Sequence, residues 1–415
     1  MYIIPMSELK PPQEQIKPIL ELFTNGQIQE ALDAVDALSI DYPDDSLLFN
    51  IRGACYAGLG QKDAAVESYK KAVLLKPDYA KAHYNLAGAL QETDQLDEAV
   101  KSYENAIALE PENAEAHNNL GNVLRELDQL DTAIKSYKKA LVINPDYVEA
   151  YYSLGLTFQD LGKLQDTVKS YKQVLTIKPD FAGMHNNLGN VYRELGDLDD
   201  AVKSYEKAIA IKPDFFEAHH SLGVIYQEHN LLNDALKSYE KVIDINTGSA
   251  EVHNNLGTIF SELNQPEKAE ASFRKALAID PNYAGAHYNF GNTLKDLNRI
   301  VEAEVSFRKA IAIDPNYAEA HNNLGNVILN PNRLVEAEAS FRKAIAIDPD
   351  YAEAHNNLGN LLVTLKKLGD AEACYRKAIA IDPDYAKAYS NLGANLKDLG
   401  KFEDAESCCR KAIAL

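Results

Sequence analysis

Asparagine recurs along this chain at a spacing of 34 residues, and its side-chain amides could bind the backbone of another protein. Positions below count Ala114 as the first residue of a repeat, so Asn119 stands at position 6. Position 6 holds Asn85, Asn119, Asn187, Asn255, Asn289, Asn323, Asn357 and Asn391. Position 5 adds Asn118, Asn186, Asn254, Asn322 and Asn356, and position 9 adds Asn122, Asn190, Asn292, Asn326 and Asn360. Because an amide carries donors and an acceptor, such a row can pair with an extended peptide without reading its side chains.

These amides also have a purely structural interpretation. A position-6 asparagine can instead satisfy backbone groups where adjacent repeats meet. Several repeats carry asparagine at positions 5, 6 and 9 together, so we favour a peptide-binding surface. Ser153 and Ser221 interrupt the row at position 6, while Tyr84, Tyr152 and Tyr288 at position 5 are predicted aromatic anchors on the same face.

Histidine recurs in the same register and raises the question of a metal site. Position 4 holds His83, His117, His185, His219, His253, His287, His321 and His355. Copies one repeat apart are separated by two helix widths of roughly 8–10 Å each. Ligands of one zinc ion all lie within about 2.3 Å of the metal. We therefore expect these histidines to pack against the core, and we expect no metal site.

No catalytic motif accompanies the periodic residues. The sequence contains no GxGxxG, phosphate-binding glycine loop, HExxH or GxSxG. Cys55, Cys374, Cys408 and Cys409 form no CxxC pair, which argues against a disulfide framework or a zinc knuckle. We expect a protein that is not an enzyme and that needs no cofactor.

The charge of the chain restricts its partners. It has 62 acidic and 42 basic residues and a formal net charge of −20, whereas nucleic acids and anionic membranes attract basic surfaces. Position 13 is acidic in eight repeats, as at Glu92 and Glu262, and is predicted to steer basic or neutral segments. The chain shows no apolar run approaching about 18 residues and no signal peptide, so we expect a soluble, cytoplasmic protein.

Two helices in each repeat must position these side chains. In 114–147, apolar residues recur at helical spacing over roughly 114–127 and again over 131–144. Proline then ends the pair, because its ring cannot continue a helix. Position 32 holds Pro43, Pro77, Pro111, Pro145, Pro179, Pro213, Pro281, Pro315, Pro349 and Pro383, and Thr247 alone breaks the series. Such a fixed period is the signature of stacked repeats that share one continuous core.

Small residues indicate where the helices of a repeat touch. Position 8 is glycine in ten of twelve repeats, and position 20 is alanine in eleven. Glycine inside a helix costs about 1 kcal/mol relative to alanine, so its recurrence predicts a close contact. Position 24 is aromatic in ten repeats and is expected to fill the space between neighbours. Together with Ala140 at position 27 and Pro145 at position 32, this pattern resembles the tetratricopeptide repeat, strongly over 46–415 and weakly over 12–45.

The resemblance implies an all-α, right-handed superhelical solenoid of stacked helix-turn-helix units. The asparagine row is similar to the tetratricopeptide arm of O-linked N-acetylglucosamine transferases and related bacterial proteins. In that family the arm docks protein substrates for a catalytic domain placed after it. We predict a protein-interaction scaffold that binds extended or helical peptide segments in a concave, asparagine-lined groove. The alternative is the substrate-docking arm of a larger glycosyl- or sulfotransferase, and a third hypothesis is a self-assembling scaffold.

The repeats divide the chain into an N-terminal extension 1–11, a divergent capping repeat 12–45, and an array 46–415 of eleven repeats, the last one truncated. Pro331 is predicted to shorten a first helix, and Pro266 is expected at the start of a second helix. The segment DINTGSA at 244–250 replaces the proline turn and is a predicted hinge. The sequence stops without a polar capping helix, so we expect a longer native protein or self-association through the last repeat.

Overall fold

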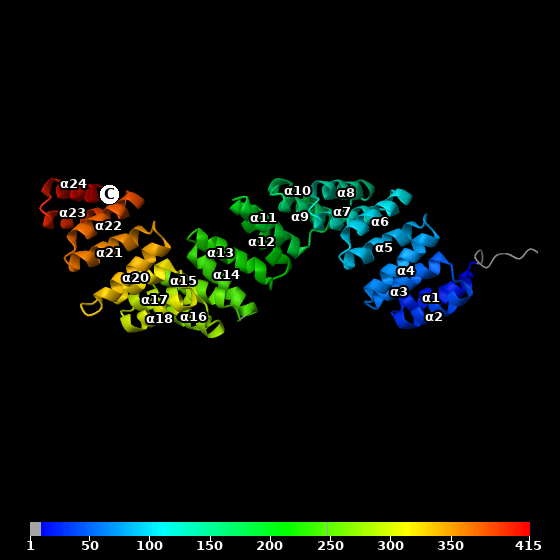
Figure 1. The fold of residues 1–415 in the computed structure, drawn as a ribbon, viewed down its shortest axis with the longest axis horizontal. Helices are drawn as coiled ribbons and strands as arrows, with labels where there is room; N and C mark the ends of the chain where they lie inside the picture. The colour runs from blue at the N-terminus through cyan, green and yellow to red at the C-terminus, as the bar shows by residue number, and fades with distance from the viewer. Residues whose placement is uncertain (1–9, 247) are drawn as a thin grey trace, which may run out of the picture. The chain divides into compact units, whose positions relative to one another are not determined.

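A computed structural model describes residues 10–246 and 248–415, and these residues form 24 helices joined by short turns, with no strands among them (Figure 1). Each repeat folds into a first helix and a second helix that pack against each other, and the second helix also packs against the first helix of the next repeat within a unit. The chain divides into two compact units, one ending at Pro213 and the other starting at Asp214. The predicted all-α repeat solenoid is confirmed.

The first unit contains α1 (Gln13–Thr24), α2 (Ile28–Asp41), α3 (Ser46–Gly58), α4 (Lys62–Leu75), α5 (Ala80–Glu92), α6 (Leu96–Leu109), α7 (Ala114–Glu126), α8 (Leu130–Ile143), α9 (Val148–Asp160), α10 (Leu164–Ile177), α11 (Ala182–Glu194) and α12 (Leu198–Ile211). The second unit contains α13 (Phe216–Glu228), α14 (Leu232–Ile245), α15 (Ala250–Glu262), α16 (Pro266–Ile279), α17 (Ala284–Asp296), α18 (Ile300–Ile313), α19 (Ala318–Val327), α20 (Leu334–Ile347), α21 (Ala352–Thr364), α22 (Leu368–Ile381), α23 (Ala386–Asp398) and α24 (Phe402–Ala414). Odd-numbered helices are the first helices of their repeats.

Most position-8 glycines lie against the aromatic ring of position 24, so they mark a close contact between the two helices of a repeat, as the sequence predicts. A Cβ atom added to Gly325 would lie 2.6 Å from the ring of Phe341, and one added to Gly121 would lie 2.6 Å from the ring of Tyr137. Both rings are fully buried. Glycine therefore lets the two helices of a repeat approach until the ring of one touches the backbone of the other.

A left-handed residue at position 15 reverses the chain between the two helices. Gly162 and Gly196 take positive φ there, and Asp128, Asn298 and Lys366 take φ of 58°, 60° and 61°. Glycine adopts this conformation without steric cost, and Asp and Asn tolerate it because their short side chains bond locally. Lys366 has neither advantage, so this turn is the strained member of the set.

Proline shapes the helices where the sequence departs from the pattern. The helix α19 ends at Val327, four residues before Pro331, because a proline ring clashes with the carbonyl group four residues earlier. Its ten residues compare with thirteen in α21, which confirms the predicted shortening. Pro266 lies at the start of α16, also as predicted, where its missing N–H costs nothing.

In the second unit, ion pairs join successive second helices. Glu304 of α18 accepts hydrogen bonds from Arg308 of the same helix at 2.9 Å and from Arg333 of the next repeat at 2.7 Å. Glu338 contacts Arg342 and Lys367 in the same way. The Glu304 side chain is only 20% exposed, so this pair is stronger than a fully solvated surface pair. Each of these carboxylates therefore forms ion pairs with its own repeat and with the next one.

Two sequence predictions concern segments that the structure covers only in part, and a third concerns the divergent repeat, which it describes in full. Residues 1–9 of the predicted N-terminal extension, and Thr247 of the predicted hinge, lie outside the described residues. The divergent repeat 12–45 forms the helix pair α1 and α2, although Pro18 lies inside α1. Among the described residues, no helix is both long and apolar enough to cross a bilayer.

Candidate peptide-binding face of the first helices

The position-6 asparagines form a side-chain ladder between consecutive first helices. In the second unit, Asn357 donates an amide N–H to Oδ1 of Asn322 at 3.0 Å, and Asn391 donates to Oδ1 of Asn356 at 2.8 Å. The same bond joins Asn289 to Asn254, and in the first unit Asn85 to Asn50. Position 6 of one repeat thus bonds to position 5 of the preceding repeat.

Tyrosine replaces the acceptor at two steps where position 5 is not asparagine. Asn119 donates to the hydroxyl group of Tyr84 at 2.9 Å, and Asn323 approaches the hydroxyl group of Tyr288 at 3.4 Å. Both tyrosines are half-buried, so these predicted anchors are engaged at their hydroxyl ends. Tyr152 is 37% exposed and stacks on Tyr171 with ring centroids 6.1 Å apart.

The position-5 asparagines are buried, contrary to the expectation that they lie on the open face. Asn322 and Asn356 are 0% exposed. The remaining members of the set are also buried, namely Asn118, Asn186 and Asn254. Consecutive first helices pack so closely that position 5 lies at their junction, and the amide there is covered by the next repeat. These residues act as supports for position 6 rather than as an exposed surface.

The interruption of the row at Ser153 leaves a mark in the structure. Asn118 precedes Ser153 by one repeat, and its buried Oδ1 meets no hydrogen-bond donor among the described residues. A serine hydroxyl is shorter than an amide and does not replace the missing N–H. A buried polar atom is normally paired. This oxygen is unpaired because the repeat that follows lacks the position-6 amide that would donate to it.

The position-9 asparagines make a different contact within their own repeat. Asn122, Asn190 and Asn360 each accept a hydrogen bond from the tyrosine at position 24, at 2.9, 2.7 and 2.8 Å. Phenylalanine at position 24 offers no hydroxyl group. In those repeats Asn292 accepts from Asn323 at 2.8 Å instead, and Asn326 forms no side-chain hydrogen bond within the part of the chain that the structure describes.

The ladder leaves hydrogen-bonding capacity at position 6. An amide has two N–H donors and an oxygen with two lone pairs. Asn289 and Asn391 each use one N–H in the ladder, and their other N–H and their Oδ1 have no described partner. Asn187 forms no side-chain hydrogen bond among the described residues, whereas Asn255 donates to Tyr239. The side chains at position 6 are half-buried, except for Asn323, which is 9% exposed.

Tyrosine and glutamate side chains accompany the amides in the second unit. The rings of Tyr288 and Tyr317 lie with centroids 4.9 Å apart. Burial, followed by the nearby rings and carboxylates that include Glu319, raises the pKa of Tyr317. Glu353 accepts from the amides of Asn322 and Asn357 at 3.3 and 3.4 Å. Neither glutamate forms an ion pair with a described lysine or arginine. Tyr288 is a predicted anchor, whereas Tyr317, Glu319 and Glu353 are not predicted from the sequence, although their positions 34 and 2 recur in the same register.

Some acidic groups at position 13 are already paired. Asp160 bonds to Arg125 of the preceding repeat at 2.7 Å, and Glu92 lies 3.6 Å from Lys62. These contacts neutralise part of the charge that the sequence assigns to the edge of the face. Steering by position 13 therefore stays a prediction.

The position-4 histidines bond to the preceding turn. In most of these repeats, ring Nε2 donates to the carbonyl oxygen of the proline at position 32, as in His83 to Pro77 at 2.9 Å and His321 to Pro315 at 3.2 Å. Burial lowers the pKa of His287 and His321, which favours the neutral ring. In these repeats the histidine thus links the first helix to the preceding turn by a hydrogen bond. Among the described residues, no three metal-ligating side chains cluster together.

Curated relatives share only short segments with this chain. The peroxisomal targeting signal receptor of Candida albicans is 36% identical over 64 residues, which are 15% of this chain and 11% of the receptor. The Saccharomyces cerevisiae receptor is 30% identical over 76 residues, which are 18% of this chain and 12% of that protein. The chain therefore spans about a tenth of the length of the curated relatives it matches.

Solved structures resemble parts of the chain. MamA is 26% identical with a TM-score of 0.39, and the match covers 41% of this chain and 92% of MamA. YrrB, described as a TPR protein with an unusual peptide-binding site, is 24% identical with a TM-score of 0.40, over 46% of this chain and 98% of YrrB.

Family models of the repeat match most of the array. The model described as "TPR repeat" matches residues 53–94, 89–126, 121–162, 189–230, 291–330 and 332–366. Models described as "Tetratricopeptide repeat" match 250–283 and 352–385, 272–305 and 374–407, and 148–181 and 216–248. The helix pairs, the glycine–aromatic contacts and these matches agree, and the chain belongs to the tetratricopeptide-repeat family.

Proposed function

We propose that this protein-interaction scaffold binds extended segments of partner proteins on the face formed by its first helices. The observation that carries the proposal is the ladder. It holds the position-6 amides of several repeats, among them Asn357, in a fixed orientation, while part of the hydrogen-bonding capacity of Asn289 and Asn391 stays unused. Amides that are fixed before binding lose little conformational entropy when a peptide arrives.

The two sets of asparagines have different roles in this proposal. Position 6 contacts the backbone of the bound segment, with help from position 9 at Asn326 and its equivalents. Position 5 is buried, so Asn322 and Asn356 act indirectly by orienting Asn357 and Asn391. A peptide backbone offers N–H and C=O groups at regular intervals, which suits a row of amides that each donate and accept.

The charge of the face favours basic segments. Glu319 and Glu353 stand beside the amides without a cationic partner among the described residues, and the whole chain carries a formal net charge of −20. The paired rings of Tyr288 and Tyr317 offer a surface on which a lysine or arginine can form a cation–π contact. We therefore propose that preferred segments combine an extended backbone with basic side chains.

Replacement of two ladder amides tests the proposal. The probe is a library of short, acetylated, unstructured peptides of defined net charge, screened against the full chain, and the strongest binder is measured by calorimetry. Asn357→Ala together with Asn391→Ala should weaken binding about tenfold, because each lost hydrogen bond contributes about 0.5–1.5 kcal/mol. The control is Asn233→Ala, at an exposed position of the second helix α14.

Three outcomes would contradict the proposal. One is equal affinity for the double variant and the native chain, provided that circular dichroism shows equal helicity. Another is a loss of affinity in Asn233→Ala as large as that in the double variant. A preference for acidic peptides would reject the proposed charge selectivity.

Two further hypotheses stay predictions. The same face would serve the substrate-docking arm of a larger transferase, which an activity screen of the native full-length protein would reveal. Pairing of copies through the last repeat would appear in light scattering as a molar mass that rises with protein concentration.

A further inference from the structure

We propose that the cleft between α16 and α18 is a second docking site, which takes an amphipathic helix with apolar and acidic side chains. This inference is independent of the first-helix face. The cleft has a volume of about 700 Å³, and the second helices contribute Leu277, Ala278, Val301 and Val305 to its lining. Val301 is 77% exposed and Val305 is 50% exposed. Such exposed apolar residues around a hollow are typical of interaction sites.

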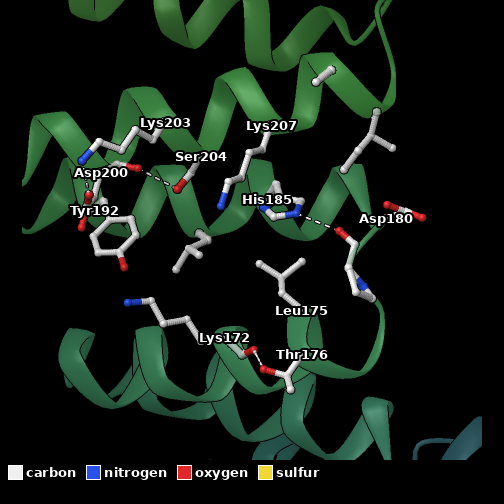
Figure 2. Close-up of a pocket in the computed structure, with 14 residues that line it drawn as sticks. Lys172, Leu175, Thr176, Asp180, His185, Tyr192, Asp200, Lys203, Ser204 and Lys207 are labelled. Carbon is white, nitrogen blue, oxygen red and sulfur yellow. Dashed lines mark hydrogen bonds and ion pairs between the residues drawn. The ribbon is translucent and has the colours of Figure 1, made fainter.

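The equivalent cleft of the first unit shows that folding does not require these valines. It lies between α10 and α12, has nearly the same volume, about 690 Å³, and is lined in the same register (Figure 2). Lys203 stands there at the position of Val305, and Asp199 at the position of Val301. Lys203 bonds to Asp200 at 3.0 Å, so the charge that replaces Val305 is paired within the first cleft.

Two more positions are polar in the first cleft and apolar in the second. Tyr192 of the first corresponds to Leu294 of the second, and Thr176 corresponds to Ala278. Lys172 extends over the ring of Tyr192, with its Nζ 5.5 Å from the centroid (Figure 2). At these four positions the second cleft therefore carries apolar side chains where the first carries polar ones, although both clefts occupy the same place in the fold.

The charge that stays unpaired among the described residues at the edge of the second cleft is cationic. Arg274 lies over Phe290 at 5.1 Å from the ring centroid and bonds to Glu270. Lys309 is exposed and forms no ion pair with a carboxylate of the described residues. The acidic residue that lines the cleft, Glu302, is already held by Arg299 at 2.6 Å. An occupant that placed a carboxylate at Lys309 would therefore meet an uncompensated charge.

The shape of the cleft favours a helix as the occupant. Its walls are two α-helices of consecutive repeats, and the ridges of a third helix fit the groove between two others. An amphipathic helix also matches the pattern of an apolar floor beside charged edges, because its apolar side chains recur on one face. The proposed partner thus presents leucine-like residues to Val301 and Val305, and glutamate or aspartate to Lys309.

A labelled helical peptide tests the site on the full chain. The probe carries leucine along one face and glutamate beside it, and a second probe has lysine in place of each glutamate. Fluorescence anisotropy measures the affinity of both. Val301→Asp with Val305→Lys, which installs the residues of the first cleft, should weaken binding of the glutamate probe at least about tenfold, equivalent to about 1.4 kcal/mol. Lys309→Glu should weaken it as well, and the lysine probe should bind native protein about tenfold more weakly.

Two controls separate this cleft from the other face. Asn357→Ala with Asn391→Ala should leave the affinity for the glutamate probe unchanged, and Asp199→Val with Lys203→Val should add a second binding event in the first cleft. Circular dichroism checks that each variant keeps its helices. Unchanged affinity in Val301→Asp with Val305→Lys, or equal affinity for the two probes, would overturn the proposal.

Discussion

The unsatisfied acceptor at Asn118 leads to a prediction that a single substitution can stabilise the array. Ser153→Asn places an amide one repeat after Asn118, where the ladder elsewhere has Asn357 and Asn391. The new N–H should reach Oδ1 of Asn118, which is buried and has no donor among the described residues. In the intact steps of the ladder, the corresponding distances are 3.0 and 2.8 Å.

The magnitude follows from the burial of the acceptor. A typical hydrogen bond contributes about 0.5–1.5 kcal/mol net, and an unsatisfied buried group costs about 1–3 kcal/mol. Asn118 is 4% exposed, so its oxygen obtains little compensation from water. Ser153→Asn should therefore stabilise the α7–α9 junction by about 1 kcal/mol. The reverse change, Asn391→Ser, should leave Oδ1 of Asn356 unpaired and destabilise its junction by about 1–3 kcal/mol.

Hydrogen exchange is the suitable assay, because long repeat arrays do not unfold in one step. Amide protection in α7 and α9 should rise in Ser153→Asn, and protection in α21 and α23 should fall in Asn391→Ser. Distant helices such as α15 serve as the internal reference in both variants. Two results together would contradict the role of the ladder: protection in α7 and α9 that does not rise in Ser153→Asn, and unchanged protection in α21 and α23 in Asn391→Ser.

Four further predictions concern packing, charge and turns. Gly325→Ala should destabilise α19 and α20 by about 1–3 kcal/mol relative to Gly88→Ala, because the new Cβ meets Phe341 at 2.6 Å; equal hydrogen exchange in the two variants would contradict this. Ala303→Leu at a 0% exposed contact should cost about 1–3 kcal/mol, visible as a lower melting temperature. Arg333 and then Arg308 lower the pKa of Glu304 to about 2. The ionised Glu304 therefore stabilises the folded chain fully above the ordinary pKa of 4.5, and this stabilisation is lost as the pH falls from there toward 2. Glu304→Gln should remove this acid sensitivity from the free energy of unfolding measured across that range. Limited proteolysis should cut first at 244–250, and earlier cleavage within any other turn would reject the predicted hinge.

Much of the fold can be predicted from the sequence because the same constraint appears in nearly every repeat. The glycine at position 8 carries a cost that only a close contact can offset, and Gly325 indeed lies against Phe341. The effect of Pro331 is equally local, since its ring forbids a helix through the preceding turn. Such requirements are visible in a single chain without knowledge of its tertiary structure.

The candidate site could be predicted only in part. Position in a helix gives the direction of a side chain, so Asn323 and Asn357 were assigned to the correct helices. It does not give the distance to the next repeat, and this distance decides that Asn322 and Asn356 are buried while most position-6 side chains, Asn323 excepted, stay half-buried. Partners across repeats, such as Tyr288 for Asn323, likewise depend on how closely the helices pack.

The carboxylates shared by two repeats have a consequence for the length of the array. Removal of residues 318–351 would bring Glu304 opposite Lys367 in place of Arg333, a pairing that Glu338 already makes at 3.4 Å. At this contact between repeats, a lysine would replace an arginine as the partner of the carboxylate, and the charge balance would be kept. We therefore expect that whole repeats can be removed or inserted here while the ion pair between neighbouring repeats is kept.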